Sequence, residues 1–480
     1  MGFLVFQIPI SDFQFLFSLS VIAAISSSPM DYPETLRYLE SLGHELRGVR
    51  FRLETIEAVL SRLGAPHLKY GTAIVAGTNG KGSTAAFLST IVQQAGYRTG
   101  LYTSPHLIRV NERIRVDGSE ISDIQFARAF TEVKEAVEEL VAKGVLESAP
   151  SFFEFLTAAA FVHFASVEAE FVVLEVGMGG RLDATNVTKP RVAVITQIDF
   201  DHQEYLGSTL AEIAGEKAGV IKPGQLVVSA ATRPEASEVI RHRSLQVNAP
   251  LIEIACDGVI THLKSRHGQY SFDFTIGGER LEGLTSPLAG RFQVENAAAA
   301  VAAAWHLGRE GMHRITRYTI LEGLRRTSWP GRIETICASP EFLLDGAHNP
   351  AGARGIADFT REHLSCRKLR LVYGSMKDKA VAEITELLWP LADEVYLTQP
   401  NHARAASPEE VLALARLRPK SLIIEPAAAR AAARALAASA AEDVVLVTGS
   451  LFLVGEIKKA LLDGSLQIPS ETARESLVRV

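Results

Sequence analysis

A glycine-rich segment that joins an apolar run to a helical pattern constrains the fold of this chain more than any other feature. The apolar run covers residues 73–75, and the pattern after the segment predicts a helix from Lys81 to about Ala95. The segment consists of Ala76, Gly77, Thr78, Asn79, Gly80, Lys81, Gly82, Ser83 and Thr84. A glycine-rich turn between a strand and a helix lets backbone N–H groups surround phosphate oxygens at the positive end of the helix dipole. We therefore interpret the segment as a phosphate-binding loop.

The side chains of this loop suit a nucleoside triphosphate with Mg²⁺. Lys81 is placed to reach the outer phosphates, and either Ser83 or Thr84 can offer a hydroxyl oxygen to the ion. The general pattern G-x-x-x-x-G-K-S/T has a hydroxyl residue directly after the lysine, but Gly82 stands there in this chain. The alternative is a glycine-rich turn without a ligand, which rarely needs three glycines, a lysine and two hydroxyls together.

Length and composition indicate a globular protein of two or three domains, because 480 residues exceed one ordinary core. Apolar residues make up 47% and charged residues 22%, which is average for such domains. A formal net charge of −6 argues against a nucleic-acid-binding protein, which would usually be basic. Cys256, Cys337 and Cys366 have no paired spacing, so the sequence indicates neither a disulfide framework nor a zinc site and favours a cytoplasmic location.

The first 29 residues differ from the rest because residues 3–6 and 13–25 are strongly apolar. A signal peptide is one interpretation, but such a peptide has a basic start and the first basic residue here is Arg37. A transmembrane helix is disfavoured because polar residues and a proline interrupt the run. We interpret residues 1–29 as an upstream extension with Met30 as the functional start, and we expect no membrane association.

Continuous apolar runs that alternate with helical patterns predict parallel strands buried on both faces. The predicted strands cover residues 73–75, 97–102, 171–176, 192–195 and 226–228 and, after a junction at 328–331, residues 342–344, 369–373, 395–397, 422–424 and 444–447. The predicted helices cover one or two segments within 31–63, and residues 81–95, 122–141, 152–165, 294–307 and 427–441.

These patterns predict an α/β protein with two folded domains. Residues 30–328 are predicted to form a P-loop-type ATP-binding domain with a parallel sheet. Within it, residues 251–284 have a shorter, alternating, glycine-rich pattern that predicts a small antiparallel patch. Residues 329–480 are predicted to form a C-terminal, Rossmann-like, doubly wound α/β domain.

Two polar motifs follow predicted strands at the edge where open α/β sheets bind their ligands. Glu175 ends one strand beside a glycine-rich turn, and we interpret it as a Mg²⁺ ligand acting with Ser83 rather than as a solvated strand end. His202 follows the next strand and is flanked by aspartates at 199 and 201, which favours a metal ligand over a structural histidine. An imidazole is an unusual ligand for Mg²⁺, so the sequence alone suggests Mn²⁺ or Zn²⁺ as readily. Further along, Lys217 is interpreted as a cation near the phosphates, with an ordinary exposed lysine as the alternative.

Taken in order, these motifs resemble the Mur ligase superfamily. The form of residues 77–83 resembles its folate branch, the folylpolyglutamate and dihydrofolate synthases, and the resemblance spans about Tyr38 to Glu456. The resemblance implies that Lys81, His202 and Lys217 are catalytic and that two Mg²⁺ ions bind. Ser83 and Glu175 would hold the first ion, and His202 and a carbamylated Lys217 would hold the second. Carbamylation requires an unprotonated amine and hence a lowered lysine pKa.

The same resemblance implies the remaining binding residues. Asn296 would read the adenine, Arg332 would contact the nucleotide, and Asp345 and His348 would complete the ATP and amino-acid site. The acyl substrate would contact Thr103, Ser104, Pro105, His106, Phe153 and Glu154. Aromatic rings can stack on a pterin while a carboxylate accepts its N–H groups, although plain core packing is the alternative for the phenylalanines.

The activity implied is ATP-driven amide formation through an acyl phosphate. We expect a bifunctional enzyme that adds L-glutamate to dihydropteroate and to folate γ-glutamyl tails. The alternatives are a ligase for tetrahydrofolate tails alone, a peptidoglycan-precursor Mur ligase, and, in a different class, a non-catalytic nucleotide-binding regulator. Residues 79–82 and 345–348 argue against the peptidoglycan ligase, and the retained Lys81, Glu175, His202 and Lys217 argue against the regulator. The resemblance also implies a monomer whose partners are small molecules.

Overall fold

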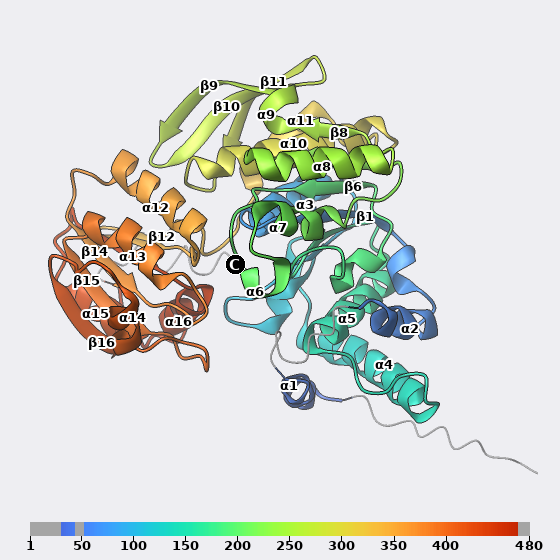
Figure 1. The fold of residues 1–480 in the computed structure, drawn as a ribbon, viewed down its shortest axis with the longest axis horizontal. Coiled ribbons are helices and arrows are strands. Elements are labelled where there is room, and N and C mark those ends of the chain that lie inside the picture. Colours follow the sequence, from blue (N-terminus) through green and yellow to red (C-terminus); the bar gives the residue numbers. More distant parts are fainter. Residues whose placement is uncertain (1–29, 44–51, 469–480) are drawn as a thin grey trace, which may run out of the picture.

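The computed structural model describes residues 30–43 and 52–468, which form three sheets with helices packed around them (Figure 1). The predicted extension over residues 1–29 and the part of the first helical prediction at 44–51 lie outside the described residues. Within the described part, no helix is both long and apolar enough to cross a lipid bilayer.

The first sheet has eight strands in the order β4-β3-β2-β5-β1-β6-β7-β8. The strands are β1 (Gly71–Ala76), β2 (Thr99–Tyr102), β3 (Ile114–Val116), β4 (Ser119–Glu120), β5 (Phe171–Glu175), β6 (Val192–Ile195), β7 (Leu226–Ser229) and β8 (Leu251–Glu253). From β2 to β8 every neighbouring pair is parallel, whereas β3 and β4 are antiparallel edge strands. The predicted parallel sheet is therefore confirmed, and its strands are buried throughout β2, β5 and β6.

Helices cover both faces of this sheet. They are α1 (Tyr32–Ser41), α2 (Glu54–Arg62), α3 (Lys81–Gln94), α4 (Asp123–Ala142), α5 (Phe152–Ser166), α6 (Gln203–Leu206), α7 (Leu210–Ala218), α8 (Pro234–Gln246), α9 (Ile254–Asp257), α10 (Phe292–Arg309) and α11 (Arg317–Arg326), with the 3₁₀ turns η1 (Pro66–Leu68), η2 (Val110–Arg113) and η3 (Ala184–Val187). The helix predicted over residues 122–141 is confirmed as α4, and Ser122 caps it, because its hydroxyl accepts the N–H of Gln125.

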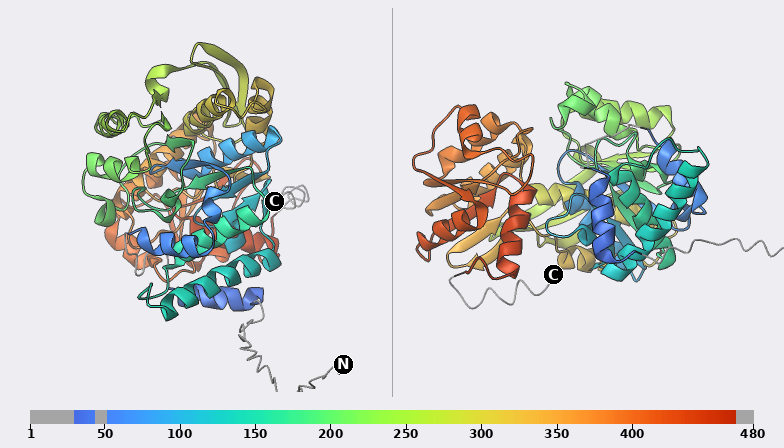
Figure 2. Two further views of the ribbon diagram at one scale, coloured as in Figure 1. Left: turned by 90° about the vertical axis from the view of Figure 1, so that its right-hand side faces the viewer. Right: turned by 90° about the horizontal axis from the view of Figure 1, so that it is seen from below.

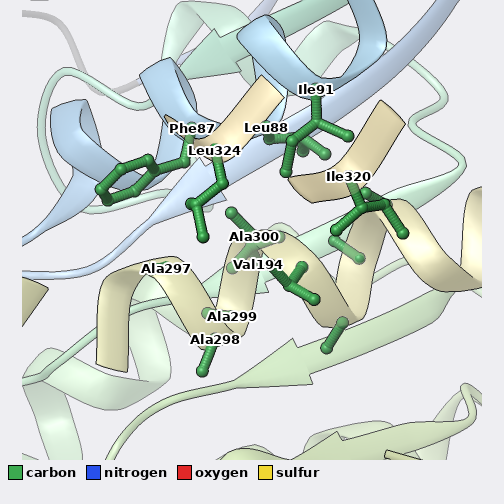
Figure 3. Packing of buried hydrophobic residues seen from close by; sticks show 14 of the residues in the cluster. Phe87, Leu88, Ile91, Val194, Ala297, Ala298, Ala299, Ala300, Ile320 and Leu324 are labelled. Atoms are coloured by element: carbon green, nitrogen blue, oxygen red, sulfur yellow. The ribbon is translucent and has the colours of Figure 1, made fainter. Parts of the chain in front are cut away.

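Alanine-rich packing holds α3, α10 and α11 on one face of the sheet. Figure 3 shows Ala297–Ala300 of α10 in the same packed cluster as Ile91 of α3 and Leu324 of α11. These alanines are fully buried, and their small side chains let the helices approach closely. At Gly323 of α11, a Cβ atom would lie 2.4 Å from the Cα of Ile91, so this crossing requires glycine.

The second sheet is antiparallel and has the order β11-β10-β9. Its strands are β9 (Gly258–Arg266), β10 (Gln269–Ile276) and β11 (Glu279–Ser286). The predicted antiparallel patch is thus present but begins at Gly258 rather than Leu251. Residues 251–253 form β8, which pairs in parallel with β7 and extends the first sheet by one strand.

The third sheet has the order β12-β13-β17-β14-β15-β16, and only β12 is antiparallel to its neighbour. Its strands are β12 (Glu334–Ala338), β13 (Glu341–Leu344), β14 (Leu369–Tyr373), β15 (Glu394–Gln399), β16 (Leu422–Ala427) and β17 (Val444–Thr448). The surrounding helices are α12 (Pro350–His363), α13 (Val381–Leu388), the 3₁₀ turn η4 (Trp389–Leu391), α14 (Pro408–Leu414), α15 (Ala428–Ala437) and α16 (Leu451–Leu462). This arrangement is the predicted second α/β unit.

The hydrophobic cores are separated along the chain. Among the described residues, three clusters of buried side chains lie within residues 39–324, and two lie within residues 333–466. No cluster of buried residues combines the two parts of the described chain. Figure 2 shows the C-terminal unit, in orange and red, beside the N-terminal unit. One contact between them joins the Tyr270 hydroxyl to the carboxylate of Glu362 at 2.9 Å.

Candidate active site

A cavity of about 730 Å³ lies between the two units and is lined by residues from both. It stands beyond the carboxyl ends of β1, β5 and β6, where open α/β sheets bind ligands. Of the predicted site residues, the cavity brings together Gly77, Thr78, Asn79, Gly80, Lys81, Gly82, Ser83, Ser104, Pro105, Phe153, Glu154, Glu175, His202, Lys217, Asn296, Arg332, Asp345 and His348. Thr84, Thr103 and His106 are not among its lining residues.

The loop between β1 and α3 needs its glycines for close contacts. At Gly80, whose φ is +89°, a Cβ atom would lie 2.2 Å from Asn296 Oδ1. At Gly82 a Cβ atom would lie 2.9 Å from the indole nitrogen of Trp329. The indole thus occupies the space that a hydroxyl residue directly after the lysine would need, and the cavity-lining hydroxyl comes one residue later, at Ser83.

Two lysines converge on the loop backbone. Lys81 Nζ donates to the carbonyl oxygens of Gly77 and Thr78, both at 3.1 Å. Lys217 Nζ, from α7, donates to the same Gly77 oxygen at 2.8 Å. Burial, reinforced by the charge of Lys81, lowers the pKa of Lys217 to about 7. A large share of this amine is therefore neutral near pH 7, and the side chain is buried rather than an ordinary exposed lysine.

Ser83 and Glu175 supply oxygen atoms beside the loop. Ser83 lines the cavity, whereas the Oγ1 of Thr84 is buried with no hydrogen-bond partner within residues 30–43 and 52–468. Glu175 is buried, and one carboxylate oxygen accepts the Ser104 N–H at 3.1 Å. Burial raises the pKa of Glu175, while Lys81 opposes that effect. A hydroxyl and a carboxylate that line the same cavity fit an ion such as Mg²⁺, which takes one or two protein oxygens plus phosphate and water.

The histidine site is organised around an aspartate. Asp201 accepts a hydrogen bond from Lys379 Nζ at 2.9 Å and one from Asn349 Nδ2 at 3.0 Å. Burial alone would raise the pKa of Asp201, but neighbouring His202, His348 and Lys379 hold it well below its usual range. Burial lowers the pKa of His202 to about 4, so its imidazole is neutral near pH 7 and can act as a ligand. Among the described residues, no three His, Cys, Asp or Glu side chains gather as a ready metal site.

The C-terminal unit holds the phosphate loop directly. The side-chain amides of Asn79 and Asn349 form a reciprocal pair, with hydrogen bonds of 3.1 and 2.9 Å. Asn349 also caps α12, because its Oδ1 accepts the N–H of Gly352. Nearby, Arg354 donates to Asp199 at 2.6 Å. Sequence reasoning did not select Asp201, Asn349 or Lys379 as site residues, although Asp201 and Asn349 lie within or beside motifs that it had singled out.

The predicted nucleotide residues lie at the start of α10 and of the third sheet. Asn296 donates to Gln293 at 2.9 Å and faces Gly80. The Asp345 carboxylate accepts the backbone N–H groups of Ile333 and Ala347 at 2.9 and 2.7 Å, so it shapes the junction as well as lining the cavity. Burial raises the pKa of Asp345, and Arg332 opposes that effect. His348 is fixed by a 2.8 Å contact between Nδ1 and the carbonyl oxygen of Gly346.

The phenylalanine cluster of α5 divides between cavity and core. Phe153 lines the cavity and packs so closely on Gly177 that a Cβ there would lie 2.6 Å from its ring. Phe155 is buried and stacks on Phe130 at a ring-centre distance of 4.3 Å. One oxygen of Glu154 accepts the N–H and hydroxyl of Ser151 at the α5 N-cap. The other oxygen is buried without a partner in the described part of the chain.

The predicted loop over residues 103–107 contributes only in part. Ser104 and Pro105 line the cavity. His106 instead accepts a hydrogen bond from Arg113 Nε at 2.9 Å, and burial lowers the pKa of its imidazole to about 3. The substrate-binding roles given to Thr103 and His106 therefore stay predictions.

Comparisons with known protein families match both units. The Mur ligase middle domain family matches residues 75–304, and the Mur ligase glutamate ligase domain family matches residues 331–451. The chain is 36% identical over 415 residues to a dihydrofolate synthase/folylpolyglutamate synthase of Bacillus subtilis, covering 86% of this chain and 96% of the relative. It is 32% identical over 442 residues to a folylpolyglutamate synthase of Lacticaseibacillus casei, covering 91% of this chain and 100% of the relative.

Solved structures show the same fold. The structure of E. coli FolC in complex with DHPP and ADP superimposes with a TM-score of 0.80 at 31% identity, covering 91% of this chain and 98% of that one. Mycobacterium tuberculosis folylpolyglutamate synthase complexed with ADP and AMPPCP superimposes with a TM-score of 0.82 at 31% identity, covering 90% and 99%.

Proposed function

Because the chain belongs to the dihydrofolate synthase/folylpolyglutamate synthase family of the Mur ligase superfamily, we propose that it adds L-glutamate to dihydropteroate and to the γ-glutamyl tails of folates. It is an ATP-dependent, amide-forming ligase. One observation carries the proposal most directly. A single cavity joins a phosphate loop with its lysine, an aromatic wall at Phe153, and a rim from the C-terminal unit.

The reaction proceeds in two displacements. A carboxylate oxygen of the acyl substrate attacks the γ-phosphorus of ATP, and ADP leaves with the electrons of the broken P–O bond. The α-amine of glutamate then attacks the acyl carbon, the C–O bond to phosphate breaks, and the amine proton passes to the departing phosphate. Lys81 and the loop N–H groups offset charge on the phosphates, and the cavity holds the reactants in position.

We propose that Ser83 and Glu175 hold one Mg²⁺ and that His202 and carbamylated Lys217 hold a second. Bound Mg²⁺ supplies positive charge that neutralises the phosphate oxygens. The lowered pKa of Lys217 supports carbamylation, because the neutral amine adds to CO₂, loses a proton and becomes a carboxylate. Without that change the protonated lysine is only a hydrogen-bond donor and does not fit a metal.

We propose that the acyl substrate lies against Phe153 and Glu154. The Phe153 ring offers a face for stacking, and the unpartnered buried oxygen of Glu154 can accept an N–H group of a pterin. Met178 and Leu182 add apolar side chains to the lining of the same cavity. We also propose that the enzyme is a cytoplasmic monomer, with residues 30–328 as the ATP-binding domain and residues 329–480 as the glutamate-ligase-like domain.

Release of ADP in the presence of Mg-ATP and L-glutamate tests the proposal. The acceptors to compare are dihydropteroate, tetrahydrofolate and UDP-MurNAc-L-alanine. We expect activity with both pterins; activity with tetrahydrofolate alone would restrict the enzyme to tail extension. Activity only with the muramyl acceptor would overturn the folate assignment, and ATP binding without glutamate-dependent ADP release would favour the regulator.

The matched variant for this assay is Lys81→Ala. We expect it to lose turnover by about a thousandfold, as expected when a phosphate-binding cation is removed. Circular dichroism should show an unchanged fold, because the hydrogen bonds of the Lys81 amine within residues 30–43 and 52–468 go to the loop backbone. Retained activity in this variant would contradict the assigned role of the loop.

A further inference from the structure

A buried chain of three polar side chains, Asn296, Gln293 and Ser83, lies in the lining of the cavity. Asn296 Nδ2 donates to Gln293 Oε1 at 2.9 Å, and Gln293 Nε2 donates to Ser83 Oγ at 3.3 Å. Gln293 is fully buried, Ser83 is 2% exposed and Asn296 is 4% exposed. Because water does not reach these groups freely, each hydrogen bond constrains its neighbours strongly.

The chain fixes the orientation of both end groups. With its Nδ2 donating to Gln293, Asn296 presents its Oδ1 toward Gly80 and the cavity. With one lone pair of Ser83 Oγ accepting from Gln293, the second lone pair and the hydroxyl proton remain for a ligand. One amide thus determines which atoms the two binding residues present.

We propose that Gln293 is a positioning residue that couples base recognition by Asn296 to the Ser83 hydroxyl beside the phosphates. The proposal rests on the proposed function, since that function assigns Asn296 to the adenine and Ser83 to Mg²⁺. It follows that Mg²⁺ binding and the preference for adenine over guanine depend on each other. Such a coupling is reciprocal, so it can be measured either from the affinity for Mg²⁺ or from the affinity for the nucleotide.

The position of Gln293 favours this role over a purely structural one. It lies at the second residue of α10, and Asn296 follows three residues later on the same helix face. Its partner Ser83 lies on α3, 210 residues away in the chain. An apolar side chain of similar size would fill the same space, so filling space alone does not call for an amide here.

Calorimetric titration of the full chain with ADP and GDP, with and without Mg²⁺, tests the coupling without any acyl substrate. We expect Mg²⁺ to change the ADP/GDP affinity ratio of the wild type. In Gln293→Leu, we expect the ADP/GDP affinity ratio to fall about tenfold and to become independent of Mg²⁺. The reason is that neither the Asn296 amide nor the Ser83 hydroxyl is then held in orientation.

A second variant separates the two ends. Gln293→Glu keeps an acceptor for Asn296 but removes the donor to Ser83. We therefore expect a base preference close to wild type that no longer responds to Mg²⁺. This variant carries the test if Gln293→Leu does not fold.

Val294→Ala is the matched control, because Val294 is fully buried in the same helix but does not line the cavity. It should lower stability while keeping the ratio and its Mg²⁺ response. If Gln293→Leu and Gln293→Glu both keep the wild-type ratio and response, the proposal is overturned. If Mg²⁺ changes the ADP/GDP affinity ratio of the wild type but the wild type does not release ADP with glutamate, the proposed coupling is supported and the proposed function is contradicted.

Discussion

The amine of Lys217 lies 2.8 Å from the carbonyl oxygen of Gly77, so a helix 140 residues away is hydrogen-bonded to the first glycine of the phosphate loop. Lys81 donates to the same oxygen. Two amines that share one acceptor cannot both be protonated at low cost in a buried site. Burial lowers the pKa of Lys217, and the charge of the neighbouring Lys81 lowers it further.

The lowered pKa of Lys217 makes stability depend on pH. Its pKa falls from 10.5 to about 7 on folding, so between these values the unfolded chain binds a proton that the folded chain has released. Stability therefore rises with pH across this range, by roughly 1.4 kcal/mol per pH unit. In CO₂-free buffer, we expect Lys217→Met to remove this dependence. The stability of the variant relative to that of the wild type should then be greatest below pH 7 and decline toward pH 9.

Urea unfolding at several pH values measures this change. The control is Lys143→Met, which removes an exposed lysine paired with Glu139 and should leave the pH slope unchanged. Parallel pH profiles for Lys217→Met and wild type would show that Lys217 titrates normally.

Asn349 serves both as a helix cap and as the partner of the phosphate loop. Asn349→Ala should lose about 1 kcal/mol of stability from the cap and also lose the pairing with Asn79. Asn349→Ser keeps a capping oxygen but cannot reach Asn79. We therefore expect both variants to lose about tenfold in kcat/KM for glutamate, while only Asn349→Ala lowers Tm appreciably.

Steady-state kinetics and calorimetry distinguish these effects. Small-angle scattering of the nucleotide complex should also show a more open average shape in both variants. A wild-type kcat/KM for Asn349→Ser would mean that the amide pair has no part in assembling the site.

The contact between Gly82 and Trp329 predicts that the effect of Gly82→Ala on stability changes sign when the indole is removed. In the wild type, Gly82→Ala should destabilise the protein by about 1–2 kcal/mol, because the new Cβ would lie 2.9 Å from the indole nitrogen. In a Trp329→Ala background the obstruction is gone, and the same change should stabilise α3 by up to about 1 kcal/mol through helix propensity. Denaturant unfolding of the four proteins completes a double-mutant cycle. Additive effects would exclude this contact as the reason for the glycine.

Phe153 and Phe155 provide a matched pair for the acyl-binding wall. Of the two, Phe153 is the one that lines the cavity. Phe153→Ala should therefore raise KM for dihydropteroate about tenfold and leave KM for ATP unchanged. Phe155→Leu should lower stability without changing either KM, because Phe155 is buried against Phe130. Equal changes in both KM values for Phe153→Ala would indicate general disruption instead.

Local patterns were enough to predict much of the fold. The succession of strand, glycine-rich loop and helix around residues 73–95, the parallel strands and the helix predicted over 122–141 are confirmed because periodicity and turn chemistry act within a few residues. The two- and three-residue strands β4 and β3 were missed because such short segments carry too little pattern. The parallel pairing of β8 was also missed, since the choice of strand partner is made in space and not along the chain.

The sequence predicted the site residues that lie in recognisable motifs. It did not predict the side-chain pairs that join the two units. Asn79 pairs with Asn349 across 270 residues, and Asp201 pairs with Lys379 across 178. A single sequence contains no signal for such distances. The role of Glu154 as a helix cap was equally hidden, although Ser151 three residues before it is a capping-box pattern that could have revealed it.

The separation of the hydrophobic cores at the junction shapes how the molecule melts. The buried clusters before residue 325 and after residue 332 share no buried member among the described residues, although Ala289, Phe292 and Leu107 of the first unit pack against the clusters of the second. We therefore expect each unit to unfold as a cooperative unit of its own. Heating the ligand-free protein should give two calorimetric transitions. A nucleotide that contacts both units raises the less stable transition toward the other, so the merging of two peaks into one measures how tightly ligand binding joins the halves.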